Sequence, residues 1–119
     1  SGVVSGTGNT DDQRGCYSYG RWILIRHDNG LSSLYTHLSG SIVSSGQDVS
    51  EGQVIGYTGG QPRQNGSGYS TGPHLHFAVF VTAGVQILPY SSSKNCQNVS
   101  IPLANPRDYL DPLGYLPNL

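Results

Sequence analysis

Hydrophobic and polar residues alternate with the two-residue period of β-strands through much of the first 90 positions. Short segments of this kind lie at 1–8, 19–27, 31–38, 42–56, 70–81 and 84–90. Asn29-Gly30 separates two of them and favours a tight hairpin turn, because this dipeptide readily takes positive φ. There is no amphipathic helix of useful length, and we expect a single helical turn near 107–110. The pattern predicts an all-β, antiparallel fold.

The segment 70–81 carries two histidines separated by one residue, in a run of β-branched and aromatic residues. In a strand, His74 and His76 share one face, and an apolar core face is formed by Leu75, Phe77, Val79 and Val81. Adjacent imidazoles on a rigid strand can hold a metal, or can divide metal binding and proton transfer between them. The alternative is that they are ordinary polar residues on a solvated face. We expect residues 84–90 to be the hairpin partner of this strand.

Two further histidines lie in the preceding hairpin. In residues 31–38 we expect one face to carry Leu34, Thr36 and Leu38, and the other to carry Ser33, Tyr35 and His37. His37 ends this strand and is a candidate for chemistry. His27 stands just before the turn, where we expect a structural role.

The remaining segments are short and rich in glycine. Residues 42–56 contain two Gly-Gln pieces that predict a compact pair of turn-punctuated strands. Residues 59–68 form a polar, glycine-rich loop, which we expect to be a mobile rim beside the strand of the two histidines. This loop lacks the lysine and the following helix of a phosphate-binding loop.

The composition indicates one domain, with a core at 1–90 and an irregular extension at 91–119. Six Lys and Arg residues balance seven Asp and Glu residues, and no basic run suggests nucleic acid. No apolar run approaches the length of a membrane span. The 17 glycines and eight tyrosines suit a secreted bacterial protein that works on glycans or peptides.

The chain contains no methionine and begins at Ser1, so we expect it to be a processed or trimmed piece of a longer polypeptide. Its two cysteines, Cys16 and Cys96, are far apart and lack the spacing of metal ligands. They predict one disulfide formed in an oxidising compartment. The alternative is a pair of buried free thiols.

Three motifs occur in an order that resembles the lysostaphin-type (LytM-like) zinc endopeptidases of bacterial peptidoglycan. They are Tyr-Thr-His-Leu-Ser at 35–39, the paired Gly-Gln pattern at 46–56, and Ser-Thr-Gly-Pro-His-Leu-His-Phe at 70–77. Asn-Pro-x-x-Tyr-Leu at 105–110 also looks like the end of such a domain. The resemblance implies a β-sheet peptidase core, a Zn²⁺ cofactor, peptidoglycan peptides as substrate, and a location that is extracellular, periplasmic or associated with the cell wall.

The resemblance also implies roles for individual residues. His76 would be a zinc ligand, while His37 and His74 would be catalytic, acting on the zinc-bound water and on the oxyanion or leaving amine. From position alone, Tyr35 and Tyr69 would line the substrate groove.

This sequence departs from the family at one important point. The family's other two zinc ligands, a histidine and an aspartate, precede the segment that corresponds to 2–4 here, and they are absent. Asp11 and Asp12 follow that segment, so they do not match the family's aspartate. The first hypothesis is therefore an N-terminally incomplete zinc peptidoglycan endopeptidase.

Two other hypotheses remain open. A metal-free relative would use the same groove as a cell-wall binding or regulatory module, and a structural β domain would serve in a surface or phage-tail assembly. A histidine and an aspartate encoded upstream of Ser1 would favour the enzyme.

Overall fold

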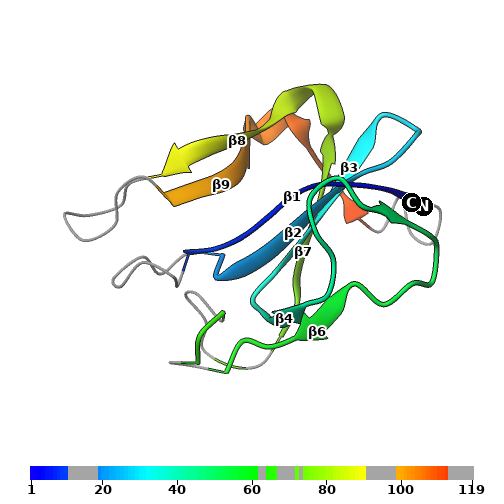
Figure 1. The fold of residues 1–119 in the computed structure, drawn as a ribbon. Coiled ribbons are helices and arrows are strands. Elements are labelled where there is room, and N and C mark those ends of the chain that lie inside the picture. The colour runs from blue at the N-terminus through cyan, green and yellow to red at the C-terminus, as the bar shows by residue number, and fades with distance from the viewer. Residues whose placement is uncertain (11–18, 62–63, 67–71, 73, 91–98, 113–119) are drawn as a thin grey trace.

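The computed structural model describes residues 1–10, 19–61, 64–66, 72, 74–90 and 99–112. Most of the strands form a six-stranded sheet in the order β10-β7-β3-β2-β1-β5, and all of its neighbouring strands are antiparallel. These strands are β1 (Gly2–Asn9), β2 (Arg21–Arg26), β3 (Leu31–Thr36), β5 (Asp48–Val49), β7 (His76–Val81) and β10 (Tyr109–Leu110). The prediction of an all-β, antiparallel fold is confirmed (Figure 1).

Two small sheets complete the described part of the chain. One pairs β4 (Leu38–Ser41) with β6 (Gly56–Thr58), and the other pairs β8 (Val85–Tyr90) with β9 (Val99–Ala104). Two 3₁₀ turns, η2 (Thr82–Gly84) and η3 (Pro106–Asp108), lie among the described residues. None of the described helices is long and apolar enough to span a membrane.

The hairpin of β2 and β3 forms at the predicted turn. Gly30 has a φ of +82°, and the Asn29 side chain accepts a hydrogen bond from the Leu31 N–H at 3.2 Å. The His27 N–H donates to the Leu31 carbonyl at 2.8 Å and closes the loop. The turn fixes the register in which Leu24 lies opposite Leu34.

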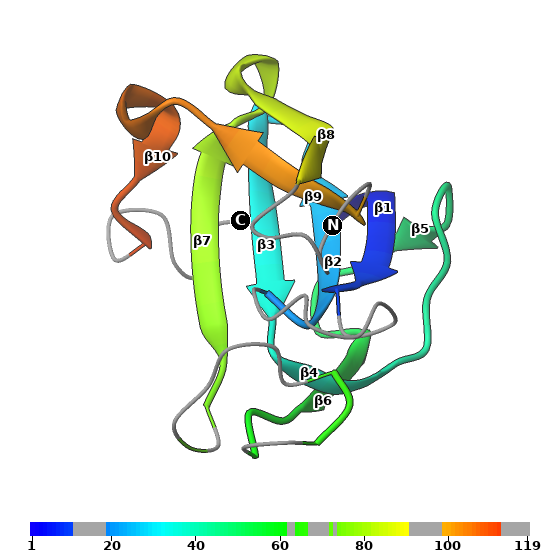
Figure 2. The ribbon, with the colours of Figure 1, turned by 90° about the vertical axis from the view of Figure 1, so that its left-hand side faces the viewer.

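The large sheet is covered on both faces. Leu24 and Leu34 belong to a buried cluster with Trp22, Ala78 and Phe80, against which the β8–β9 hairpin packs through Val85 and Ala104. The opposite face carries a second cluster, composed of Val4, Ile23, Ile25, Leu38, Val43 and Val49. Figure 2 shows the β8–β9 hairpin crossing one face of the sheet. The face of β7 that carries His76 is also buried at Ala78 and Phe80, because the hairpin covers it there.

The predicted pairing of residues 84–90 with the histidine-bearing strand is also wrong. The neighbours of β7 are β3 and β10, whereas β8 pairs with β9 in the register Ile87 to Pro102. The turn η2 directs the chain out of the large sheet between β7 and β8. Residues 99–110, expected to be irregular, contain two strands, and the helical turn predicted near 107–110 lies at Pro106–Asp108.

The two Gly-Gln pieces at 42–56 form matching turns. In one, the Gln47 N–H donates to the Ser44 carbonyl at 3.1 Å, and the Gln47 side-chain oxygen accepts from the Ser44 N–H at 3.1 Å. Gln53 makes the same pair of bonds with Ser50, at 3.0 Å and 3.0 Å. Gly46 and Gly52 take φ values of +89° and +82°, as the third position of such turns requires.

Candidate active site

The candidate site lies at the end of the sheet where β3 finishes and β7 begins. Thr36, the last residue of β3, pairs with His76, the first residue of β7. The Thr36 hydroxyl donates to the His76 carbonyl at 3.1 Å. The small β4–β6 sheet lies at this same end (Figure 2). Antiparallel pairing thus brings two segments about 40 positions apart in sequence to one edge.

His37 interrupts the alternation of β3. It has a φ of +59°, in the left-handed region that residues other than glycine seldom occupy, and the residue is only 5% exposed. Before it, Leu34 packs in the cluster of Trp22, and after it Leu38 packs in the cluster on the opposite face. The expectation that Leu34 and Leu38 share a face is therefore wrong, because the backbone at His37 reverses the facing of the chain.

This conformation brings three imidazoles together. The ring centroid of His37 lies 4.7 Å from that of His74 and 5.9 Å from that of His76. The rings of His37 and His76 are close to parallel, with an interplanar angle of 28°. The three residues that the motifs singled out therefore form one cluster, built from the end of β3, the start of β7 and the segment before β7.

His74 is held by hydrogen bonds on its backbone and on its ring. Its N–H donates to the Gly59 carbonyl at 2.9 Å, so that residues 59 and 74 form an isolated antiparallel bridge. Its Nδ1 lies 2.8 Å from the Gly72 carbonyl, which can only accept a hydrogen bond. The proton of the neutral ring is therefore on Nδ1, and Nε2 carries the lone pair. Such a ring can act as a proton acceptor through Nε2.

His76 is the member of the cluster that starts β7, and it is partly exposed to solvent. Its ring and that of Tyr19 are in edge-on contact, with a centroid distance of 6.1 Å. Partial burial, and secondarily the neighbouring His74, lower the pKa of His76 below its ordinary value. The neutral form, which is the form that coordinates metals, is therefore favoured at His76.

A pocket of about 440 Å³ adjoins His74, and its described lining consists of Thr58, Gly59, Gln61, Gln64, His74 and Leu75. Two glycines allow the pocket wall to approach the histidines. A Cβ on Gly59 would lie 2.8 Å from the His37 carbonyl oxygen. Gly60, at a φ of +94°, would place a Cβ 2.8 Å from the His74 nitrogen. Sequence reasoning did not single out these glycines, although the Gly-Gly doublet was a visible signal.

Arg21, the first residue of β2, lies outside the sequence motifs but contacts the site. Its guanidinium donates to the carbonyls of Leu38 and Ser39, directly after His37, and to the Asn65 side chain. Its N–H donates to the Gly66 carbonyl at 2.7 Å. Residues 65 and 66, within the loop 59–68 for which a mobile rim is predicted, are thus hydrogen-bonded to β2.

Two other candidates, Tyr35 and His27, lie away from the cluster. Tyr35 lies on the opposite face of the sheet from His76, where it packs against Phe77 and the cluster of Ile23 and is separated from the histidine cluster. His27 has the structural setting expected of it, with Nδ1 2.8 Å from the Ser1 carbonyl and Nε2 2.8 Å from the Ser33 hydroxyl. Outside the described residues lie Asp11, Asp12, Cys16, Tyr69 and Cys96.

The three histidines supply imidazole nitrogens, a donor type that zinc accepts, and His76 is favoured in the neutral form that coordination needs. Within the described residues, however, no three His, Cys, Asp or Glu side chains are arranged to hold a metal ion. His76 therefore fits the part of a single ligand, and the described residues do not by themselves make a complete zinc site.

Comparison with protein families assigns the chain to a known class of peptidases. The model of peptidase family M23 matches residues 1–89, and the chain belongs to this family. The resemblance to lysostaphin-type peptidases that the motifs indicated is thereby confirmed.

Individual relatives include proteins named as endopeptidases. The chain is 46% identical over 59 residues to the DD-carboxypeptidase/endopeptidase Mpg of Neisseria meningitidis. The matched region covers 50% of this chain and 12% of that protein. The chain is also 36% identical over 85 residues to the peptidoglycan DD-endopeptidase ShyC of Vibrio cholerae. This matched region covers 71% of the chain and 16% of ShyC. The chain thus spans a small part of the curated relatives that it matches.

Two solved structures have a similar fold. The catalytic domain of the antimicrobial peptidase lysostaphin from Staphylococcus simulans superposes with a TM-score of 0.62 and 28% identity, over 97% of this chain and 64% of that one. A zinc-containing peptidase from Vibrio cholerae superposes with a TM-score of 0.55 and 32% identity, over 68% of this chain and 21% of that one.

Proposed function

We propose that this chain is part of a zinc-dependent endopeptidase that hydrolyses peptide bonds in bacterial cell-wall peptidoglycan. The observation that carries the proposal is the convergence of His37, His74 and His76 at one end of the sheet. Membership of peptidase family M23 supports it, as do relatives named peptidoglycan DD-endopeptidases.

In this proposal His76 is one zinc ligand, and two further ligands come from outside the described residues. A zinc ion held there would act as a Lewis acid and would lower the pKa of water to about 7. His74, with its proton on Nδ1, accepts a proton from the attacking water through Nε2. His37 then donates a hydrogen bond to the developing oxyanion, or a proton to the leaving amine. Since His37 is almost fully buried, its ring is held in place before substrate arrives.

The pocket beside His74 supports a peptide substrate. Among the described residues its lining offers glutamine and threonine side chains, whose amide and hydroxyl groups can hydrogen-bond the backbone of a peptide segment. Peptidoglycan lies outside the cytoplasmic membrane, so the proposal places the protein in an extracellular, periplasmic or wall-associated compartment.

The experiment that tests the proposal uses the full-length protein with whatever sequence flanks this chain. Its zinc content is measured after extensive dialysis, and its activity is measured as the release of new amino groups from purified peptidoglycan. We expect about one zinc per chain, and hydrolysis that a chelator abolishes and added zinc restores. A folded protein that binds no zinc and releases no amino groups would overturn the proposal, and retained binding to peptidoglycan would then favour a metal-free binding module.

A further inference from the structure

We propose that Arg21 is a positioning residue that holds His37 in its left-handed conformation and ties the glycine-rich loop to it. This inference rests on the proposed function, because it assigns Arg21 a part in the turnover attributed to His37. Arg21 lies in residues 19–21, which precede and begin β2. This segment contacts both His37 and the loop.

The backbone at His37 needs support, because a left-handed histidine is unfavourable unless neighbouring structure fixes it. Two sets of hydrogen bonds supply that support. On one side the His37 N–H donates to the Tyr19 carbonyl at 2.9 Å. On the other side Arg21 Nη1 donates to the Leu38 carbonyl at 3.2 Å and also to the Ser39 carbonyl. The residues on both sides of the reversal are thus anchored to one short segment.

The other terminal nitrogen of the guanidinium, Nη2, faces the glycine-rich loop. Nη2 of Arg21 donates to the Asn65 side-chain oxygen at 3.3 Å, and this oxygen also accepts from the Asn9 side chain at 2.9 Å. The loop lies so close that a Cβ on Gly66, at a φ of +95°, would be 2.6 Å from Nη1. Arg21 therefore connects the strand that follows His37 to the loop whose neighbouring residues, Gln61 and Gln64, line the pocket.

Arginine is suited to this position by its shape. Its guanidinium is planar and presents donors in a fixed fork, so that one nitrogen can serve two carbonyls while the other serves an amide. A lysine ammonium is a single point and cannot hold these three acceptors in the same plane. The positioning effect is therefore expected to depend on the fork as well as on the charge.

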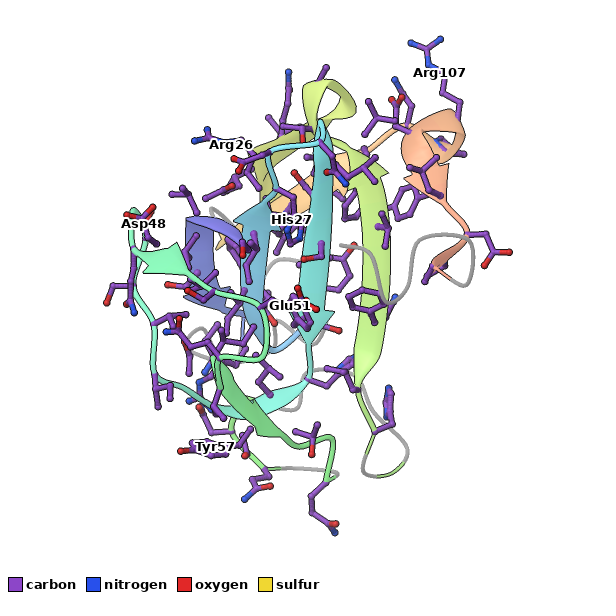
Figure 3. All side chains as sticks on the ribbon, turned by 90° about the vertical axis from the view of Figure 1, so that its right-hand side faces the viewer. Arg26, His27, Asp48, Glu51, Tyr57 and Arg107 are labelled. Atoms are coloured by element: carbon purple, nitrogen blue, oxygen red, sulfur yellow. The ribbon has the colours of Figure 1, made fainter. Side chains whose placement is uncertain are left out.

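The test compares Arg21→Met and Arg21→Lys in the full-length protein with Arg26→Met as the matched control. Arg26 is the exposed last residue of the same strand and lies at the opposite end of the molecule from Tyr57 of the β4–β6 sheet (Figure 3). We expect Arg21→Met to lower kcat for peptidoglycan hydrolysis by about 10- to 100-fold, with KM changed less than about threefold, since small displacements of a catalytic group have effects of this size. Arg21→Lys should recover only part of the loss, and Arg26→Met should match the wild type.

A second measurement reads the position of His37 without relying on turnover. Histidine-labelled protein gives ring signals in NMR spectra, and those of His37 should shift in Arg21→Met while those of His27 stay in place. If Arg21→Met keeps the wild-type kcat, or Arg21→Lys restores it fully, the assignment is overturned. Unchanged His37 signals would overturn it as well. If the wild type hydrolyses no peptidoglycan, the proposed function fails, and the His37 signals still decide the positioning role.

Discussion

His37 shows how a single backbone angle decides which residues can form the site. Strand periodicity assigns His37 to the face of Tyr35, whereas the φ of +59° turns its ring toward His74 and His76. No composition signal marks this reversal, because left-handed backbone is usually announced by glycine or asparagine. The motif grouped His37 with His74 and His76, and their rings do lie together, whereas strand alternation alone would have placed His37 on the opposite face.

The three histidines should separate metal binding from turnover when each is replaced by alanine. His76→Ala should lose bound zinc, because it removes the proposed ligand. His37→Ala and His74→Ala should retain about one zinc per chain and lose turnover by about 100-fold or more, in line with the loss of a general acid or base. Zinc content and peptidoglycan hydrolysis of the full-length variants check this. If all three variants kept hydrolysis, the assignment of the site would be wrong.

Gly60 provides a test of how closely the pocket wall must approach His74. Gly60→Ala adds a Cβ that meets the Gly72 carbonyl and the His74 nitrogen at 2.8 Å, at a φ of +94°. We expect a loss of about 2 kcal/mol in the free energy of unfolding, and a lower kcat as His74 is displaced.

Gly52→Ala is the matched control for Gly60→Ala. It has a φ of +82° and nothing within 4 Å of the added Cβ. It should lower stability by about 1 kcal/mol from backbone strain alone, with unchanged hydrolysis. Denaturant titration and initial rates measure both variants. Equal effects on kcat would show that close packing at Gly60 is not needed by the site.

The two Gly-Gln turns are stabilised by contacts within four residues, so the sequence repeat encodes them directly. Each glutamine side chain accepts from the N–H of the serine three residues before it, at 3.1 Å for Gln47 and 3.0 Å for Gln53. Gln47→Ala and Gln53→Ala should each lower the free energy of unfolding by about 0.5–1.5 kcal/mol, the usual net contribution of one hydrogen bond.

Glutamate retains an acceptor oxygen at these positions, so Gln47→Glu and Gln53→Glu should keep most of the stability that the alanine variants lose. Urea titration at neutral pH measures all four variants. Hydrolysis should be unaffected, because neither turn contacts the histidine cluster. A glutamate variant as destabilised as its alanine counterpart would contradict the capping role.

Strand pairing beyond the hairpins could not be derived from the sequence, for identifiable reasons. Residues 84–90 have a strand pattern and follow β7 closely, which favoured a hairpin between them. The true partner is β9, which contains Pro102. Because proline has no N–H to donate to a neighbouring strand, its presence argued against a strand in the sequence. Pairing at β10 involves two residues, Tyr109 and Leu110, too few for any periodicity. The Asn29-Gly30 turn, by contrast, was decided by local chemistry and was predicted correctly.

At the scale of the whole molecule, the fold is built from contacts that connect distant parts of the chain. The β8–β9 hairpin lies against the first strands, since a Cβ on Gly6 of β1 would meet the Ile87 side chain at 2.6 Å. The segment that contains Cys16 connects β1 to β2, and the segment that contains Cys96 connects β8 to β9. The predicted disulfide would thus join two connections whose flanking strands are packed together.

A bond between Cys16 and Cys96 would close a loop of roughly 80 residues, which is expected to stabilise the protein by about 4.5 kcal/mol through the unfolded state. A thiol assay on denatured, unreduced protein should find no free thiol, and the same protein after reduction should show two. Cys16→Ser and Cys96→Ser should each lower the unfolding free energy by about 2–5 kcal/mol, and the double variant should lose no more than either single one. Two free thiols before reduction would remove the disulfide and, with it, one argument for an oxidising compartment.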